Sequence, residues 1–429
     1  MKDRETPALP AILPASPGVS RRGLLTTAGR AVIGGAALAA GGPFILSARG
    51  EVPVKIGLVF AKQGTWTEQG ELLVNGATIA LEQAKSQTLG RPVQLVWYDE
   101  PSPQAAQQNF QKLAEEEKVV AVLGGTNSGT SLAMGAVAKR VKVPFITPNA
   151  AAREITGKEC NPYTFRVLTT TPVASRAMGP QLAAIGKKWY FICASYAFGM
   201  DVYAEMRKQL DQAGGTEVGF DKTPLGTTDF SSFLLKIRQA KPDVIVAGLP
   251  GGDLSAFLKQ FSDMGMKGKV PVACPIIGDS DLWSIGPEAA TGIYGKPWHF
   301  SDPNNTAADL EFIATYHGKY GKPPADKAWL GWFTMRSLLG GIEKAGSVEA
   351  AALVRGLETA RFEEDGAIPA YFRDWDHQML RRSLVLKVKD KITDKWDWLD
   401  VVKVTPENPL DLEKQFGTRE EIACPMEKA

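Results

Sequence analysis

From Val54 onward, short apolar runs alternate with longer segments whose apolar residues recur at helical spacing. Near-continuous apolar strands separated by helices are typical of parallel sheets that are covered by helices on both faces. The sequence therefore predicts an α/β fold with doubly wound parallel sheets. The predicted strands are 54–60, 92–100, 119–125, 143–150, 188–195, 242–250 and 269–278, and the predicted helices are 75–86, 103–118, 200–215, 229–241, 252–266 and 323–346.

The alternation restarts near residue 188, which indicates two similar α/β halves. A chain of 429 residues is long enough for two lobes that each have a core. Residues 382–404 alternate apolar and polar side chains around a turn at 389–394, which predicts a β-hairpin.

The first 50 residues differ in charge from the rest. They hold six basic and two acidic side chains, while the whole chain has a formal charge of +2, so the remainder carries −2. The body therefore has no basic surplus for nucleic acid. Within residues 1–50, Arg21 and Arg22 precede a stretch rich in glycine and alanine that resembles a twin-arginine export signal. A membrane anchor is the alternative, and the glycines and Pro43 disfavour it. We expect cleavage between about Ala39 and Glu51, and export to a bacterial periplasm.

Residues 121–140, "AVLGGTNSGTSLAMGAVAKR", place a glycine-rich loop between a predicted strand and a helix. A phosphate-binding P-loop needs a lysine, and none occurs between Gly124 and Ala138. The loop also lacks the G-x-G-x-x-G pattern of dinucleotide sites. What remains is a helix N-terminus rich in hydroxyl groups, which suits a small anion or serves only as a helix cap.

The cysteines and histidines do not indicate a metal site or a hydrolase. The four cysteines have no metal-ligand spacing, the three histidines are widely separated, and no cofactor motif is present. Cys193 and Cys274 lie in apolar runs and are predicted to be buried thiols. Cys160 and Cys424 lie in polar contexts, and we predict that they form a disulfide in an oxidising compartment.

Several motifs in order resemble those of type I periplasmic solute-binding proteins of ABC importers, in the branched-chain amino acid group. They are "VKIGLVF", "VVAVLGGTNSGTSLAMGAVAKRVKVPFITPNA", "YAFGMDVYAEM", "TTDFSSFLLKIRQAKPDVIVAG" and "FRDWDHQM". The resemblance covers about Val54 to about Val404 and implies two lobes joined by three crossings. The implied boundaries are 52–168 plus 300–372 for the first lobe, 169–299 plus 373–405 for the second, and 406–429 for a C-terminal tail.

The resemblance also implies ligand-binding positions in the first lobe. Ser128 matches the serine that binds the ligand's carboxylate, and Asn149, Ala150 and Ala151 match the second binding loop. Ala151 stands where amino-acid binders have a threonine. Trp66 lies where the family's first loop reaches the ligand.

In the second lobe, Phe198 replaces a tyrosine and Leu249 stands where another aromatic residue is common. The family's acidic partner for an ammonium group is expected near residues 274–277, but "CPII" contains none. Asp279 could substitute if the loop is shifted. Because an unpaired buried ammonium is costly, the sequence favours a ligand without one.

These features predict a periplasmic receptor that closes around a small carboxylate and performs no chemistry, so the chain is not predicted to be an enzyme. The expected ligand is an aromatic or hydrophobic organic acid or a branched-chain amino acid. The expected partners are permease subunits at the inner membrane, and the receptor is expected to be a monomer. The alternatives are a periplasmic sensory module and, with less support, a periplasmic redox enzyme.

Overall fold

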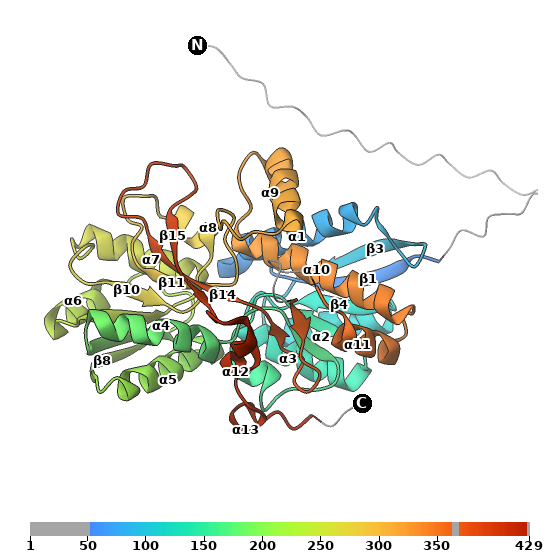
Figure 1. The fold of residues 1–429 in the computed structure, drawn as a ribbon, viewed down its shortest axis with the longest axis horizontal. Helices are drawn as coiled ribbons and strands as arrows, with labels where there is room; N and C mark the ends of the chain where they lie inside the picture. The colour runs from blue at the N-terminus through green and yellow to red at the C-terminus, as the bar shows by residue number, and fades with distance from the viewer. Residues whose placement is uncertain (1–51, 363–368, 427–429) are drawn as a thin grey trace, which may run out of the picture. The chain divides into compact units, whose positions relative to one another are not determined.

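The computed structural model describes residues 52–362 and 369–426, which fall within one compact unit (Figure 1). The predicted export signal lies outside the described residues. Within them, no helix combines the length and the apolar character needed to cross a membrane.

The first sheet has six strands in the order β2-β3-β1-β4-β5-β6. All neighbours are parallel except β2 and β3. The strands are β1 (Val54–Val59), β2 (Gln87–Thr88), β3 (Arg91–Tyr98), β4 (Ala121–Gly124), β5 (Phe145–Thr147) and β6 (Thr164–Arg166).

The second sheet has seven strands in the order β15-β14-β11-β10-β9-β7-β8. Strands β7 to β11 pair in parallel, and β14 and β15 complete the sheet as an antiparallel hairpin. In Figure 1 these two red strands lie beside the green and yellow elements of the second sheet. The strands are β7 (Lys188–Ala194), β8 (Thr216–Thr223), β9 (Val244–Gly248), β10 (Val272–Cys274), β11 (Ile293–Lys296), β14 (Ser383–Val388) and β15 (Leu399–Thr405).

Helices cover both faces of both sheets, as the apolar strands predict. In β1, Ile56 and Leu58 pack into one core with α1 and α10, whereas Val59 packs into a separate core with α2 and α3. In β7, Phe191 and Ile192 divide between two cores in the same way. The helices around the first sheet are α1 (Thr67–Gln83), α2 (Pro103–Glu115), α3 (Ser128–Val141), α9 (Ala307–Tyr320), α10 (Asp326–Ala345) and α11 (Ala350–Thr359). Those around the second are α4 (Thr171–Ile185), α5 (Ala197–Gln212), α6 (Ser231–Ala240), α7 (Gly251–Asp263) and α8 (Asp279–Trp283).

The chain passes between the regions of the two sheets three times: after β6, after β11 and before β14. The third passage includes a small two-stranded sheet of β12 (Tyr371–Phe372) and β13 (Met379–Leu380). The two α/β halves and their three connections agree with the predicted fold class. The individual lobe boundaries given above remain predictions.

Three elements differ in detail from the sequence-based expectation. Helix α1 begins at Thr67 rather than near residue 75. Helix α6 begins at Ser231 rather than at Asp229, whose carboxylate accepts a hydrogen bond from the Ser231 amide. The tail forms short helices, η3 (Pro409–Asp411), α12 (Leu412–Phe416) and α13 (Arg419–Ile422), that the sequence pattern did not predict.

Candidate ligand-binding site

One pocket is lined by residues that follow strands of both sheets. Loops after β4, β5, β7, β9 and β10 contribute, so the pocket lies at the carboxyl ends of parallel strands, where open α/β sheets bind ligands. The lining residues are Trp66, Gln69, Thr126, Asn127, Ser128, Asn149, Ala151, Leu168, Tyr196, Phe198, Pro250, Gly251, Ile276, Ile277, Gly278, Asp281 and Lys327.

The glycine-rich loop forms one wall of this pocket and starts α3. Asn127 is the N-cap, and its side chain accepts a hydrogen bond from the Thr130 amide. Gly125 has a φ of +88°, and a Cβ there would lie 1.9 Å from Ser131 Oγ, so the turn requires glycine. Ser128 Oγ accepts a hydrogen bond from the Ala152 amide at 3.3 Å and keeps its own proton to donate. The N-terminus of α3 therefore offers a hydroxyl and a favourable dipole to an anion.

Behind this wall, Glu100 is buried against the same loop. Its carboxyl group accepts hydrogen bonds from the amides of Gly125 (3.1 Å) and Thr126 (2.7 Å) and from Thr130 Oγ1 (3.3 Å). Burial raises the pKa of Glu100 to about 8, and the hydrogen bonds only partly offset this. Glu100 thus holds the loop and carries a proton at neutral pH.

The raised pKa of Glu100 makes a variant informative. Because the folded state binds the proton more tightly than the unfolded state, the contribution of Glu100 to stability falls as the pH rises from about 4.5 to about 8. We expect Glu100→Gln to gain stability relative to the parent by about 1 kcal/mol per pH unit in this window. Urea denaturation of both proteins at pH 5, 6.5 and 8 measures the difference. A difference that does not change with pH would mean that Glu100 stays ionised.

Aromatic side chains from both halves form a second wall. The ring of Trp66, from the short helix η1 (Gly64–Trp66), lies 6.5 Å from that of Tyr196, which lies 6.1 Å from that of Phe198. Tyr196 immediately precedes α5 and was not among the predicted site residues. This wall suits an apolar or aromatic ligand body.

A chain of hydrogen bonds crosses the pocket from the first half to the second. Asn149 Nδ2 donates to Gln69 Oε1 at 3.0 Å, and Gln69 Nε2 donates to Asp281 Oδ1 at 3.2 Å. Asp281 Oδ2 also accepts from the Gly278 amide at 3.0 Å. Burial raises the pKa of Asp281 to about 6 despite the opposing charge of Lys327, so the carboxylate is mostly ionised at neutral pH.

Asp279 does not line the pocket, which corrects the suggestion that it substitutes for the missing acidic residue. Its buried carboxylate pairs with Lys296 Nζ and accepts from the Asp326 amide at 2.9 Å. His299 Nδ1 lies 3.6 Å away. Burial alone would raise the pKa of Asp279, but Lys296 and His299 together hold it below its ordinary value. These partners hold the carboxylate in a buried ion cluster instead of the pocket.

Two other predicted residues also lie outside the lining. Leu249 is fully buried in the core that packs on β9, because it precedes α7 and faces that core. Ala150 is fully buried between two residues that do line the pocket, Asn149 and Ala151. Trp66, Ser128 and Phe198 reach the lining. Their role in binding remains a prediction.

Four lining residues were not predicted from the sequence: Gln69, Tyr196, Asp281 and Lys327. Asp281 lies only two residues beyond Asp279, so the acidic pair just past residue 277 was its signal in the sequence. Lys327 has no local signal, because α10 reaches the pocket only through tertiary packing.

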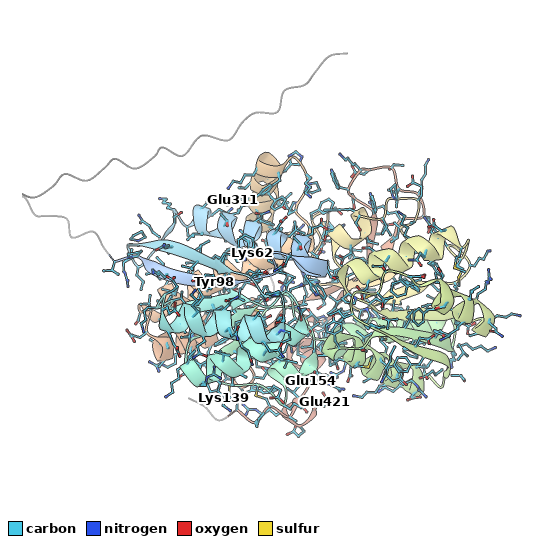
Figure 2. The ribbon with its side chains drawn as sticks, turned by 180° about the vertical axis from the view of Figure 1, so that it is seen from behind. Lys62, Tyr98, Lys139, Glu154, Glu311 and Glu421 are labelled. Atoms are coloured by element: carbon cyan, nitrogen blue, oxygen red, sulfur yellow. A yellow bond between two sulfur atoms is a disulfide. The ribbon has the colours of Figure 1, made fainter. Side chains whose placement is uncertain are left out.

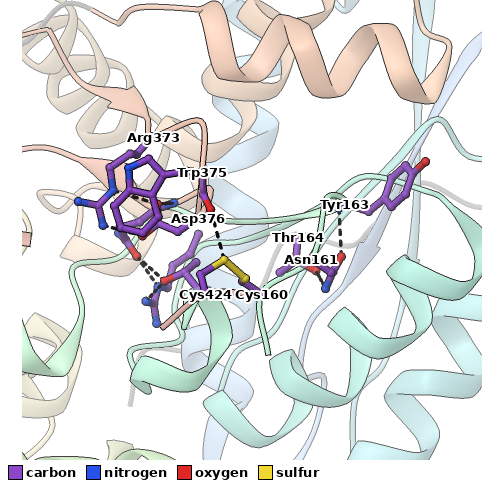
Figure 3. The surroundings of a disulfide bond; sticks show 11 residues. Cys160, Asn161, Tyr163, Thr164, Arg373, Trp375, Asp376 and Cys424 are labelled. Atoms are coloured by element: carbon purple, nitrogen blue, oxygen red, sulfur yellow. Dashed lines mark hydrogen bonds and ion pairs between the residues drawn. A yellow bond between two sulfur atoms is a disulfide. The ribbon is translucent and has the colours of Figure 1, made fainter. Parts of the chain in front are cut away.

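Cys160 and Cys424 form the predicted disulfide, with Cα atoms 5.7 Å apart (Figure 3). Cys193 and Cys274 are free and buried. Cys424 Sγ lies 3.3 Å from the carbonyl oxygen of Trp375, in the third passage between the sheets. The disulfide therefore fixes the C-terminal tail beside that passage.

Comparison with known proteins extends these observations. The family described as "periplasmic binding protein" matches residues 53–393. Leu/Ile/Val-binding protein homolog 6 of Brucella abortus is 26% identical over 324 residues, which cover 71% of this chain and 80% of that protein. A periplasmic binding protein of Burkholderia mallei has a similar structure, with a TM-score of 0.80, 24% identity, and coverage of 87% of this chain and 98% of that one.

A solute-binding protein of an ABC transporter from Rhodopseudomonas palustris BisB5, solved with 3,4-dihydroxybenzoic acid, has a TM-score of 0.75 and 24% identity. The similarity covers 81% of this chain and 96% of that one. The matched family and these relatives are binding proteins rather than enzymes, in agreement with the sequence-based prediction. The match over residues 53–393, together with the two α/β halves, shows that this chain belongs to the periplasmic binding protein family, as a type I member that resembles the Leu/Ile/Val-binding proteins.

Proposed function

We propose that this chain is the substrate-binding component of an ABC importer and that its ligand is an α-amino acid with an apolar or aromatic side chain. One observation carries the proposal: the pocket has the N-terminus of α3 on one side and the carboxylate of Asp281 on the other. A carboxylate at Ser128 and an ammonium at Asp281 would satisfy both. Trp66, Tyr196 and Phe198 would contact the apolar remainder.

The charges around Asp281 support an ammonium group. Asp281 adjoins the ion cluster of Asp279, Asp326 and Lys296 through Lys327, whose Nζ lies 3.2 Å from Asp326 Oδ2. The two lysines and His299 pair with Asp279 and Asp326, whereas Asp281 forms no ion pair within the described residues and so can accept a positive charge. The sequence-based preference for an organic acid without an ammonium group rested on the absence of an acidic residue at 274–277. It considered Asp279 as a substitute and did not include Asp281.

An aromatic organic acid is the second candidate, because the aromatic wall of Trp66, Tyr196 and Phe198 suits a flat ring. The Rhodopseudomonas palustris relative was solved with such an acid, whereas the Brucella relative is named for amino acids. Leucine and 4-methyl-2-oxopentanoate separate the two classes, because they differ mainly in the ammonium group.

Calorimetric titration with this ligand pair tests the proposal. We expect the parent to bind leucine more tightly than the oxo acid. Ser128→Ala should weaken leucine binding by about 1.5–3 kcal/mol, the usual range for a hydrogen bond to a charged group. Asp281→Asn should weaken leucine binding at least about tenfold and leave the oxo acid nearly unchanged.

Asp263→Asn is the matched control, because Asp263 is an exposed carboxylate at the end of α7. Tighter binding of the oxo acid than of leucine, with no effect of Asp281→Asn, would contradict the amino-acid assignment. If Ser128→Ala abolished the binding of both ligands while Asp281→Asn had no effect, the pocket would still be identified as the binding site, but not as one for an ammonium group.

We further propose a periplasmic monomer that delivers its ligand to permease subunits at the inner membrane. The family match and the motif at Arg21 and Arg22 support export. N-terminal sequencing of the protein recovered from the periplasm tests the route, with cleavage expected between about Ala39 and Glu51. An uncleaved N-terminus on that protein would contradict this expectation.

A further inference from the structure

A second cavity lies where the tail meets the passages between the two sheets. It has a volume of about 340 Å³, which is within the range of small-molecule sites. It shares no lining residue with the pocket described above. Its described lining residues are Arg153, Thr156, Arg166, Thr170, Pro172, Arg176, Glu205, Lys208, Gln209, Gln212, Arg373, Asp376, Gln378, Phe416, Glu421 and Ile422. Figure 2 labels Glu421, in α13 of the tail, and Glu154, the neighbour of Arg153.

Arg166 is the least usual residue on this wall. It ends β6, its side chain is fully buried, and none of its neighbours among the described residues is a carboxylate within ion-pair distance. Its Nε donates to Gln378 Oε1 at 2.6 Å, its Nη1 to the Ala152 carbonyl at 2.5 Å, and its Nη2 to Thr156 Oγ1. A guanidinium has five N–H donors, so two are left over.

The carboxylates on the wall already have partners of their own. Asp376 binds Arg373 through two hydrogen bonds of 3.0 and 2.6 Å. Glu421 lies 3.3 Å from Arg176 Nη2. Asp376, Asp201 and Glu154 attract Arg166 electrostatically, but none of the three forms an ion pair with it in the described part of the chain.

Glu205 completes this balance, because it pairs with both Arg153 and Lys208. The described lining thus holds five cationic side chains and three carboxylates, and Asp201, Glu154 and Glu413 pair with Arg153 and Arg373 from outside the lining. Burial lowers the pKa of Arg166 to about 10, which still leaves it charged at neutral pH. A buried charge without a partner is costly, and an anion in the cavity would remove that cost.

We propose that this cavity binds a small organic oxyanion, a carboxylate or a phosphate, with Arg166 as its innermost ligand. The planar guanidinium matches the paired oxygens of either group. Thr170 and Pro172 place the N-terminus of the 15-residue helix α4 on the same wall, and its dipole also favours an anion. Phe416 and Ile422 offer apolar contacts to the rest of such a molecule.

Calorimetric titration of the mature chain with citrate and, separately, with inorganic phosphate tests this site at low ionic strength. We expect one saturable site for at least one of the two anions, and the anion that binds distinguishes carboxylate from phosphate chemistry. Arg166→Gln should weaken binding at least about tenfold. Ser128→Ala should leave it unchanged, which separates this site from the amino-acid pocket.

Because Arg166 also holds three protein groups, a second variant is needed that does not disturb the core. Arg176→Gln with Lys208→Gln removes two cations whose side chains are 37% and 56% exposed. We expect this pair to weaken binding several-fold. Lys62→Gln with Lys139→Gln, two exposed lysines labelled in Figure 2, removes the same charge elsewhere and should have little effect.

Two results would overturn the proposal. One is the absence of saturable binding of both anions to the parent chain. The other is equal weakening by the cavity pair and the control pair, which would show a general charge effect. Either result leaves the leucine experiment untouched, since that experiment concerns the other pocket.

Discussion

Replacing Lys296 with methionine is expected to lower the free energy of unfolding by about 3–5 kcal/mol. Lys296 Nζ pairs with Asp279 Oδ1 and lies 3.5 Å from Asp326 Oδ1, and all three side chains are at most 1% exposed. Without the ammonium group, Asp279 would keep only the Asp326 amide and His299 among its described partners, and Asp326 would keep Lys327. Urea denaturation followed by circular dichroism measures the loss.

Lys387→Met is the matched control, because Lys387 lies on the neighbouring strand β14 and is exposed. Its pair with Asp390 is a surface contact, so we expect a change of no more than about 1 kcal/mol. Adding Asp279→Asn to Lys296→Met should recover part of the lost stability. A Lys296→Met protein as stable as the control would mean that the cluster tolerates the loss of the ammonium group.

The ion cluster also explains how the pocket obtains its polar side chains. Asp279 and Asp281 lie on α8, and Asp326 and Lys327 begin α10. The hydrogen bond from the Asp326 amide to Asp279 holds α8 against the start of α10. Asp281 of α8 and Lys327 of α10 therefore both reach the pocket. Asp279 is therefore a positioning residue, and its effect on ligand binding should follow its effect on stability.

Removal of the disulfide is expected to have the second large effect. Cys160 and Cys424 are 264 residues apart in sequence, and loss of a native disulfide typically costs about 2–5 kcal/mol. We expect Cys160→Ala with Cys424→Ala to unfold at correspondingly lower urea concentration. The tail should also become more sensitive to protease, because only non-covalent contacts would then hold it. These include the packing of α12 on Val173 and Leu380 and the hydrogen bonds and ion pairs from Arg176 and Arg373.

Reduction of the parent protein provides the control for this variant. Dithiothreitol should lower the stability of the parent to that of the double variant and should not affect the variant itself. Cys193 and Cys274 are buried and free in both proteins, so they do not contribute to the difference. Equal stability of the oxidised parent and the variant would contradict the prediction.

Much of the fold could be predicted because the buried strands are short apolar runs with clear ends. Strand β7 is such a run, and helix α10 is marked by a long segment whose apolar residues recur at helical spacing. Strand β8 was missed because it lies at the edge of its sheet and mixes exposed and half-buried residues. Helix α4 was missed because Pro172 and Pro180 interrupt its pattern.

The candidate site was only partly predictable for a similar reason. Ser128 and Asn149 follow strands directly, so a sequence motif locates them. Asp281 and Gln69 belong to helices that the tertiary fold brings across from each other. No periodicity along the chain encodes a contact between residues 212 positions apart.

The hydrogen bond from Gln69 to Asp281 also bears on how an ammonium group would bind. It joins the two α/β halves, and a hydrogen bond to a charged group contributes about 1.5–3 kcal/mol. This energy corresponds to a factor of about ten or more in the ratio of molecules whose two halves are joined to molecules whose halves are apart. An incoming ammonium group would have to displace the Gln69 amide from Asp281, so the measured affinity would report an exchange of partners and not a simple gain.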